Sequence, residues 1–342
     1  MLIHIFSDTP HHYKPMVEFY LRYIESEQCF WVLGNNTNKD KDILFFSCEK
    51  KLYQALDAQP SETRLVFHGL FSPVLIRNLA LSHMLSRATC VLWGAEIYRN
   101  KNVQGLKGYL NWFAHRLLLS RAQCVITLNS GDAELVKNYM KLKRKVDILP
   151  YPLIDFGLTL ANGQNEKLKI LLGNSADPAN NHKQLIDHVA NADLPEFEVY
   201  MPLNYAGTKE YIQEIITYAQ KRLGQCFIPI TAIMSKPEYD SLLCKVDLSL
   251  FAHQRQQGLY VVYAMLLQGK PIFLDTCTSS YSDLTIQGFS LGDINKFSKL
   301  TNAELTQLIM QPMEINQQLM VSTFTEAALG PKWAAMLVDS ND

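Results

Sequence analysis

No run of apolar residues in this 342-residue sequence approaches the roughly 18 residues that a membrane-spanning helix needs. The seven cysteines are scattered and form no C-x-x-C pair, which argues against a disulfide framework or a dithiol site. Neither G-x-G-x-x-G nor the Walker A pattern occurs, so a dinucleotide dehydrogenase or a P-loop nucleoside triphosphatase is not expected. The start, Met1 to Phe6, lacks the features of a signal peptide, and we expect a protein of the reducing cytoplasm.

The sequence also lacks a large excess of charge of one sign. Lys and Arg number 32 against 33 Asp and Glu, so the net charge is −1, and nucleic acid is not an expected partner. The charges are unevenly spread, because residues 1–155 hold 19 basic and 14 acidic side chains while the remainder holds 13 and 19. The N-terminal half therefore suits an anionic surface better than the C-terminal half does.

The length and the order of apolar segments predict two α/β domains. At roughly 100–200 residues per domain, 342 residues favour two domains over one. Strand-like and helix-like segments alternate in both halves, which is typical of parallel sheets covered on both faces. The expected divisions are an N-terminal domain at 1–150, a linker at 151–167, a C-terminal domain at 168–300 and a helical segment at 301–342. In such sheets, ligands bind outside the carboxyl ends of the strands.

The stretch 173–182, GNSADPANNH, directly follows the predicted strand 168–172. Gly173 allows a tight turn and a close approach of the backbone to a ligand. Short polar side chains follow it, and either of two asparagines could cap the next helix, whose start favours anions. An ordinary turn between strand and helix has a similar composition, so the stretch alone leaves both interpretations open.

A second polar loop follows the predicted strand 246–250. It contains His253, Arg255, Gln256, Gln257 and Gly258, and an apolar helix begins there. The arginine can bind a diphosphate through two parallel hydrogen bonds, and the helix start offers further N–H donors. The alternative is a solvated loop. We favour the binding interpretation. The apolar helix should be buried, and it should hold the loop within the cleft that we expect between the two domains.

Three predicted strands of the N-terminal half end in side chains suited to proton transfer. SDTPHHY at 7–13 carries Asp8, His11 and His12; FHG at 67–69 carries His68; WGAEIY at 93–98 carries Glu96. Carboxylate and imidazole groups on one rim could remove a proton from a hydroxyl nucleophile. The paired histidines also suggest a metal site, but no spacing typical of metal ligands accompanies them, and we expect no metal.

These stretches together resemble one family. The matching patterns, in family order, are S-D-x-P-H-H at 7–12, F-H-G at 67–69, W-G-A-[DE]-x-Y at 93–98, G-N-S-x-D-x-x-N-x-H at 173–182, P-x-x-Y at 202–205 and R-Q-Q-G at 255–258. The family is that of the bacterial TDP-4-acetamido-4,6-dideoxygalactose (TDP-Fuc4NAc) transferases of enterobacterial common antigen synthesis, also called 4-alpha-L-fucosyltransferases. This chain departs from the family pattern at Glu96, where Asp is usual, and at Leu259-Tyr260, where small residues are usual.

The resemblance implies a GT-B glycosyltransferase, an α/β protein of two Rossmann-like domains facing across a cleft. It implies a TDP-sugar donor at the C-terminal domain and a lipid-linked (undecaprenyl diphosphate) saccharide acceptor at the N-terminal domain, with no cofactor, at the cytoplasmic face of the bacterial inner membrane. The expected donor-binding residues are Gly173, Asn174, Ser175, Asp177, Asn180, His182, Tyr205, Arg255, Gln256, Gln257 and Gly258. The expected acceptor-side residues are His68, Gly69, Trp93, Gly94 and Tyr98.

For catalysis, we expect Arg255 to stabilise the leaving diphosphate. Asp8, His11, His12 and Glu96 are the candidates for a base, and the sequence does not choose among them. A sugar-nucleotide epimerase of similar architecture and a non-catalytic nucleotide-sugar-binding scaffold remain the alternatives to a transferase. The sequence also leaves open the donor sugar, the stereochemistry of transfer and the oligomeric state.

The helical segment 103–123 is a candidate for peripheral attachment to an anionic inner-membrane surface. Its apolar stripe would comprise Leu106, Leu110, Phe113, Leu117 and Leu118, and its basic flanks Lys107, Arg116 and Arg121. The same stripe could instead pack into the domain core.

Overall fold

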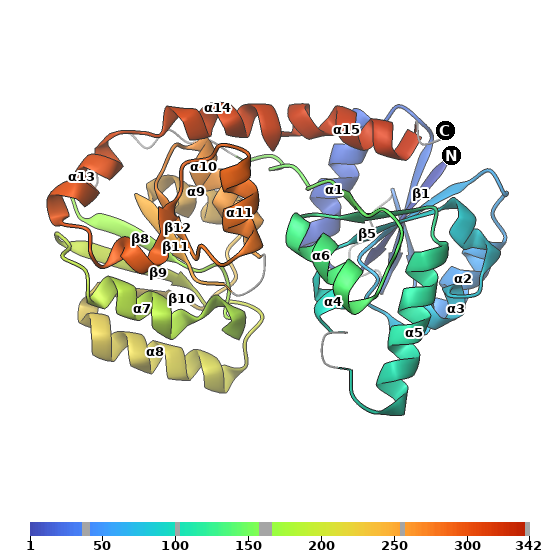
Figure 1. Cartoon of the computed structure of the whole chain (residues 1–342), viewed down its shortest axis with the longest axis horizontal. Coiled ribbons are helices and arrows are strands. Elements are labelled where there is room, and N and C mark those ends of the chain that lie inside the picture. Colours follow the sequence, from blue (N-terminus) through green and yellow to red (C-terminus); the bar gives the residue numbers. More distant parts are fainter. Residues whose placement is uncertain (36–41, 100–102, 157–165, 254–256, 339–342) are drawn as a thin grey trace. The chain divides into compact units, whose positions relative to one another are not determined.

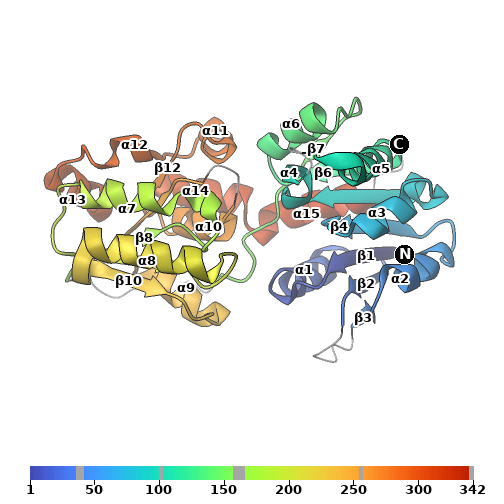
Figure 2. The same ribbon diagram turned by 90° about the horizontal axis from the view of Figure 1, so that it is seen from below.

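The structure, a computed structural model, describes residues 1–35, 42–99, 103–156, 166–253 and 257–338, without the side chain of His11. The chain forms two compact units. Unit 1 comprises Met1–Ile154 together with Glu326–Asp342, and unit 2 comprises Asp155–Thr325. Figures 1 and 2 show the two units, each with helices on both faces of a central sheet.

Unit 1 is built on a seven-stranded parallel sheet in the order β3-β2-β1-β4-β5-β6-β7. Its strands are β1 (Leu2–Ser7), β2 (Gln28–Leu33), β3 (Ile43–Phe46), β4 (Arg64–His68), β5 (Ala88–Leu92), β6 (Cys124–Thr127) and β7 (Asp147–Ile148). Its helices are α1 (Pro10–Tyr23), α2 (Glu49–Asp57), α3 (Pro73–Leu79), α4 (Ala95–Tyr98), α5 (Gly105–Arg121), α6 (Ser130–Tyr139) and α15 (Glu326–Val338), with a 3-10 turn at His83–Arg87. The middle strands β1, β4 and β5 are almost wholly buried, as their continuous apolar sequence predicts for a sheet covered on both faces.

Unit 2 repeats this plan with a six-stranded parallel sheet in the order β10-β9-β8-β11-β12-β13. Its strands are β8 (Leu168–Leu172), β9 (Phe197–Pro202), β10 (Phe227–Ile230), β11 (Leu248–Phe251), β12 (Ile272–Leu274) and β13 (Gly292–Asp293). Its helices are α7 (His182–Ala190), α8 (Lys209–Leu223), α9 (Lys236–Lys245), α10 (Leu259–Leu267), α11 (Ser279–Ile286), α12 (Ile294–Phe297), α13 (Asn302–Met310) and α14 (Glu314–Thr323), with 3-10 turns at Pro178–Asn180 and Gly224–Cys226.

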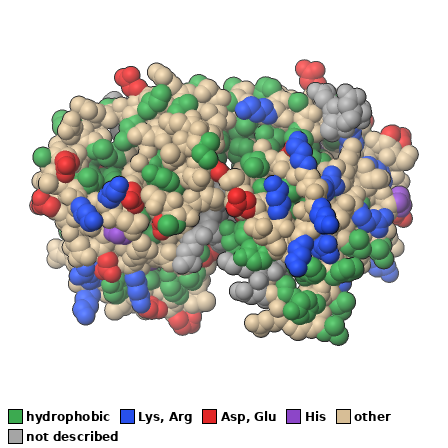
Figure 3. Space-filling view, in the orientation of Figure 1, with side chains coloured by type: hydrophobic (Ala, Val, Ile, Leu, Met, Phe, Trp, Pro, Cys, Tyr) green, Lys and Arg blue, Asp and Glu red, His purple; other side chains and the backbone are tan. Residues whose placement is uncertain are grey.

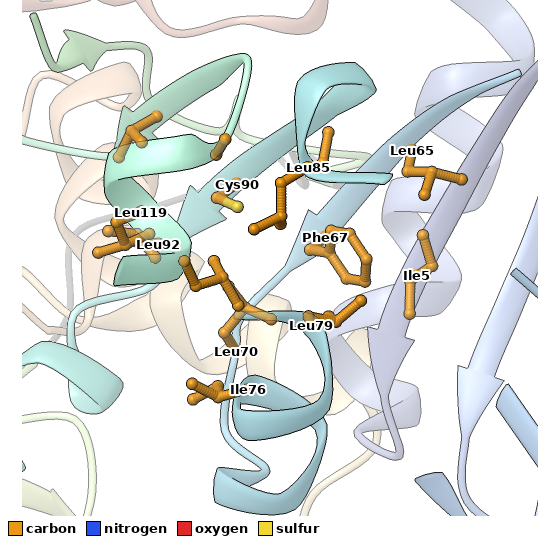
Figure 4. Packing of buried hydrophobic residues seen from close by; sticks show 14 of the residues in the cluster. Ile5, Leu65, Phe67, Leu70, Ile76, Leu79, Leu85, Cys90, Leu92 and Leu119 are labelled. Carbon is orange, nitrogen blue, oxygen red and sulfur yellow. The ribbon is translucent and has the colours of Figure 1, made fainter. Parts of the chain in front are cut away.

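Each unit has its own hydrophobic core. In unit 1 the core packs between the sheet and helices such as α3 and α5, and Figure 4 shows Ile5, Phe67, Leu79 and Leu92 converging there. In unit 2 the corresponding cluster includes Leu250 and draws on β8, β9, β11, α7 and α8. Separate cores of this kind hold the loops at the strand ends in fixed positions.

The C-terminal segment differs from the expectation of one helical block. Helices α13 and α14 belong to unit 2, whereas α15 belongs to unit 1, where it packs on α1. Gly330 of α15 fits against the ring of Tyr23, because a Cβ there would lie 2.1 Å from Tyr23 Cδ1. Trp333 is fully buried beside the rings of Tyr20 and Tyr151. Tyr151, which the sequence assigned to the linker, is thus part of unit 1.

The two strand orders have the same consequence for ligand binding. In each sheet the chain first adds strands on one side and then returns to add strands on the other, so the order reverses between β1 and β4 in unit 1 and between β8 and β11 in unit 2. Doubly wound sheets bind ligands in the crevice at the carboxyl ends of the strands beside such a reversal. The motifs found in the sequence follow these strand ends.

Candidate functional site

The loop after β8 in unit 2 is a rigid, internally hydrogen-bonded turn. Gly173 has a φ of +67°, and its N–H donates to the Leu250 carbonyl of the neighbouring strand at 3.0 Å. The side chain of Asn180 accepts from the Asn174 N–H at 3.3 Å and donates to the Ser175 carbonyl at 3.1 Å. Asn180 is fully buried, so it fixes the loop from beneath and does not present its amide to a ligand.

His182 has a similar supporting role. Its Nε2 lies 2.8 Å from the Ser175 carbonyl oxygen, so that nitrogen donates, and Nδ1 lies 2.9 Å from the Tyr211 hydroxyl. Burial lowers the pKa of His182, which keeps the ring neutral and leaves Nδ1 as the acceptor. Asp177 also acts within the loop, because its carboxylate accepts from the Ala179 N–H at 2.9 Å. The polar composition of this loop is therefore largely explained by its own architecture.

Three of the sequence motifs meet at Asn174. Its side-chain amide donates to the Tyr205 hydroxyl at 3.2 Å, which joins the loop after β8 to the loop after β9. Gly258, at the start of α10 with a φ of +68°, packs directly on it, since a Cβ at 258 would lie 2.8 Å from Asn174 Cγ. Asn174 Oδ1 is buried and accepts no hydrogen bond from the described residues.

The start of α10 supplies donors to the same place. The first N–H groups of a helix have no partner within the helix and carry the positive end of its dipole, which favours anions. Tyr205, half-exposed, borders this position, and Gln257 is partly buried beside it. Arg255, the expected ligand of the diphosphate, and Gln256, an expected donor-binding residue, lie outside the described residues.

The rim of unit 1 is formed by the loops after β1, β4 and β5. Asp8 and His12 are exposed there, and Asp8 packs on Gly34, where a Cβ would lie 2.5 Å from Asp8 Oδ2. His68 and Glu96, which we expected on the rim, are fully buried. Their side chains lie behind the loops, so in this structure neither can contact an acceptor. Both side chains point inward, beneath the backbone of their loops, and not outward as we expected.

Glu96 instead connects two of these loops. Its Oε1 accepts from the Trp93 N–H at 2.9 Å and lies 3.4 Å from the Leu70 N–H. Burial raises the pKa of Glu96 to about 7, against the opposing effect of these N–H donors. Gly94, with a φ of +95°, turns the chain between Trp93 and Glu96 with no room for a side chain, because a Cβ would lie 2.8 Å from Asp132 Oδ2.

Part of this rim is aromatic. Trp93 is partly exposed, and its ring meets Phe71 edge-on at a centroid distance of 5.8 Å and His12 at 5.3 Å. We call these three side chains, Trp93, Phe71 and His12, the aromatic rim. Gly69 fixes Phe71, because its φ is +73° and a Cβ would lie 2.5 Å from the Phe71 ring. Tyr98, at the end of α4, is partly buried.

The sequence analysis missed Tyr151, His4 and Gln28. These residues form a buried hydrogen-bonded chain that ends at the Trp93 indole. His4 lies in the predicted first strand and Tyr151 in the predicted linker, and neither position gave a sign of a polar role. In the part of the chain that the structure describes, no group of three or more His, Cys, Asp or Glu side chains is arranged to hold a metal ion. Within the same residues, no helix has the length and apolar content required to cross a bilayer.

A sequence-family model described as 4-alpha-L-fucosyltransferase, glycosyltransferase group 56, matches residues 1–342. The chain belongs to this family. The resemblance found in the sequence motifs is therefore confirmed, and so is the expectation that the protein is a glycosyltransferase enzyme.

Solved structures with the same fold agree. HepE from Anabaena, solved in complex with UDP and glucose, has a TM-score of 0.73 at 13% identity, with coverage of 99% of this chain and 100% of that chain. Sucrose-phosphate synthase from Thermosynechococcus elongatus gives 0.70 at 12% identity over 98% of each chain. A glycosyltransferase from Rickettsia africae gives 0.69 at 10% identity over 100% of this chain and 99% of its own. At such identities the likeness shows the fold, and it confirms two parallel-sheet α/β domains of the GT-B type.

Proposed function

We propose that this glycosyltransferase moves a deoxy-acetamido sugar of the Fuc4NAc type from a TDP-sugar to a lipid-linked saccharide on undecaprenyl diphosphate, in the synthesis of enterobacterial common antigen. The observation that carries the donor part is the meeting of three distant motifs at Asn174 in unit 2. Residues 173–182, Tyr205 and Gly258 come from separate parts of the chain, and the reversal of strand order brings them together.

The chemistry of this position suits a nucleoside diphosphate. The diphosphate leaves with its negative charge, and preorganised N–H donors and a fixed cation stabilise that charge during transfer. The start of α10 provides the donors, and Gly258 lets a ligand approach the backbone closely. Arg255, three residues before Gly258 in the sequence, is the cation that we propose for the leaving diphosphate.

The acceptor hydroxyl belongs at the rim of unit 1 in this proposal. Asp8 and His12 are the base candidates that exposure favours, because both reach solvent while Glu96 and His68 do not. Glu96 contributes by holding the Trp93 and Leu70 backbones in place. An inverting route would use Asp8, His12 or His11, whose side chain lies outside the described residues, as the base, whereas a retaining route needs no conventional base.

Attachment to the membrane through α5 completes the proposal. Leu106, Tyr109, Leu110 and Phe113 are 78%, 60%, 56% and 54% exposed, and spacings of three and four residues place them on one face of the helix. The predicted stripe therefore divides, since its last member, Leu118, is buried in the core. Exposed Lys107 lies within this half, and Arg77 of α3 bonds to Asn111 beside it, whereas Arg121 lies at the other end of α5. Figure 3 shows Lys and Arg side chains gathered with apolar ones on this side of unit 1. An anionic bilayer suits that combination.

The proposed reaction is tested by a screen of TDP- and UDP-sugars with a lipid-linked disaccharide acceptor, followed by product analysis. We expect transfer from a TDP-sugar that depends on the acceptor. An epimerase would change the donor when no acceptor is present, and a scaffold would bind the donor without turnover. Either of those results would overturn the proposed function.

A further inference from the structure

We propose that Tyr151, His68 and His4 are positioning residues that fix the Trp93 indole as a stacking surface for a sugar ring of the acceptor. This inference rests on the proposed function, because it names the part of the rim that would hold the acceptor saccharide. It is carried by a buried chain of hydrogen bonds whose direction can be worked out from one end to the other.

The chain begins at Gln28. Its Nε2 lies 3.1 Å from the Tyr20 carbonyl oxygen and 2.9 Å from the Ile24 carbonyl oxygen, so that atom must be the donating nitrogen. The side-chain oxygen of Gln28 is then an acceptor, and it lies 3.1 Å from His4 Nε2. The proton of His4 is therefore on Nε2.

Both histidines of the chain are neutral. Burial lowers the pKa of His4 to about 3, and it lowers the pKa of His68 well below the usual value, with a further contribution from His4. A neutral His4 with its proton on Nε2 can only accept at Nδ1, which lies 3.0 Å from His68 Nε2. His68 therefore donates from Nε2 and accepts at Nδ1.

The other end of the chain reaches the rim. His68 Nδ1 lies 2.7 Å from the Tyr151 hydroxyl, which must donate to it. The Tyr151 oxygen is then available to accept, and the Trp93 indole N–H donates to it at 3.0 Å. The only arrangement of protons that satisfies every one of these bonds ends with the indole N–H directed into the protein.

Aromatic packing holds the chain in place. Trp333 stacks on Tyr151 at a centroid distance of 5.3 Å, and Phe6 stacks on His68 at 4.3 Å. The Tyr20 ring lies 4.5 Å from that of His4. Neutral buried imidazoles that keep all their hydrogen bonds are costly to rearrange, because an unpaired buried donor or acceptor loses about 1–3 kcal/mol. The indole orientation is therefore set before any ligand arrives.

The fixed indole suits a pyranose. A sugar ring has hydroxyl groups at its edge and an apolar C–H face, and that face can cover an aromatic ring and remove apolar surface from water. Because its N–H is already bonded to Tyr151, Trp93 offers a flat surface and no competing polar group. Phe71 and His12 bound that surface on the aromatic rim. Binding surfaces that are rigid beforehand lose less entropy on binding.

The test compares two replacements of Trp93 in transfer to the lipid-linked disaccharide. Trp93→Phe keeps a flat ring, and we expect the acceptor KM to stay within about 3-fold of the unaltered protein. Trp93→Leu keeps apolar volume without a flat ring, and we expect its KM to rise about 10-fold with little change in kcat, since only binding common to ground and transition states is lost. Equal KM values for the two variants would overturn the stacking surface.

The positioning role needs a second variant. Tyr151→Phe keeps the ring stacked on Trp333 but removes the acceptor of the Trp93 N–H, and we expect a KM about 3-fold higher together with a shifted tryptophan emission. Tyr13→Phe, which alters another buried tyrosine of unit 1 outside the chain, is the matched control and should change neither. Unaltered KM and emission in a folded Tyr151→Phe variant would remove Tyr151 from the positioning role.

A binding experiment separates failure of this inference from failure of the proposed function. The free acceptor disaccharide should quench tryptophan emission of the unaltered protein and of Trp31→Phe, a buried-tryptophan control, but not of Trp93→Phe. If the unaltered protein transfers no sugar, the proposed function fails, and quenching that depends on Trp93 still supports the surface. Quenching that persists in Trp93→Phe overturns the inference even if transfer occurs.

Discussion

The loops at the strand ends of the two units are held by different sets of contacts. In unit 2, short polar side chains such as Asn180 and His182 bond to the backbone of their own loop. In unit 1, Glu96 also bonds to the backbone of its own loop, but the Trp93 side chain is held by Tyr151, 58 residues away in sequence, and part of the edge is aromatic. A backbone held open by its own side chains suits the charged diphosphate that we propose there, whereas a fixed aromatic edge suits a sugar. In this proposal, similar sheets carry loops adapted to different ligands.

The largest effect that we expect on the donor side comes from Arg255→Ala. Turnover should fall by about 100-fold or more, because groups that stabilise developing charge commonly contribute that much. Arg222→Ala is the matched control in the same unit, since Arg222 pairs with Asp187 on the surface, and it should leave turnover unchanged. Steady-state kinetics of both folded variants measures the effect. Near-normal turnover of Arg255→Ala would remove that residue from the leaving-group role.

On the unit 1 side, membrane binding should depend on the exposed face of α5. Changing Leu106 and Leu110 together to Gln should weaken vesicle binding by about 30-fold. Burying one such side chain fully contributes about 1.5–3 kcal/mol, and only part of that free energy is gained at a membrane surface, where the side chain is buried shallowly. The same change at Ile233 and Ile286, which are 82% and 81% exposed in unit 2, is the control and should have no effect. Sedimentation with anionic vesicles at low and high salt gives the answer. Equal binding of vesicles by both double variants would contradict the proposed role of α5 in membrane attachment.

Gly258→Ala should weaken donor binding by about 10-fold. Both its φ of +68° and the 2.8 Å approach of a Cβ to Asn174 Cγ disfavour a side chain. Gly224→Ala separates the two causes, because Gly224 has a φ of +58° but nothing within 4 Å of a Cβ. Calorimetric titration with TDP should show weaker binding only for Gly258→Ala. If the two variants bind TDP alike, Asn174 and the start of α10 do not form the donor position.

An effect on stability, and not on binding or turnover, should appear in the pH dependence of unfolding through Glu96. Its pKa is raised to about 7 in the folded protein, so the folded state keeps a proton that the unfolded state releases above about 4.5. The contribution of this group to the free energy of unfolding is therefore complete below a pH of about 4.5. It falls, by up to about 3 kcal/mol, as pH rises through 7. Denaturant unfolding of the unaltered protein and Glu96→Gln should give a difference that grows over this range. A constant difference would show that the Glu96 pKa is ordinary.

Much of the fold could be predicted from sequence, because alternating apolar segments determine parallel sheets. The strand at 168–172 was placed to the residue, and the motif loops follow strands as expected. Helices α2 and α11 are harder to predict, because they are only nine and eight residues long. The exact start of a helix is harder to predict: α1 begins at Pro10 and contains Pro15, so a proline, although favoured in the first turn, does not by itself mark the start.

The candidate site was predicted less completely. The family resemblance placed Asn174, Tyr205 and Gly258 in one group, and the structure brings these three together. Burial could not be read from the motifs, so His68 and Glu96 were expected to face a ligand although both lie inside. Tyr151 gave no local signal, because its role depends on partners 58 and 83 residues away in sequence.

The assignment of donor to unit 2 and acceptor to unit 1 is tested most directly by one paired measurement. The TDP dissociation constant and the acceptor KM are determined for Gly258→Ala and for Trp93→Leu. We predict that Gly258→Ala weakens TDP binding and leaves the acceptor KM within about 2-fold, and that Trp93→Leu does the reverse. A Trp93→Leu variant with weakened TDP binding and an unaltered acceptor KM would contradict the account.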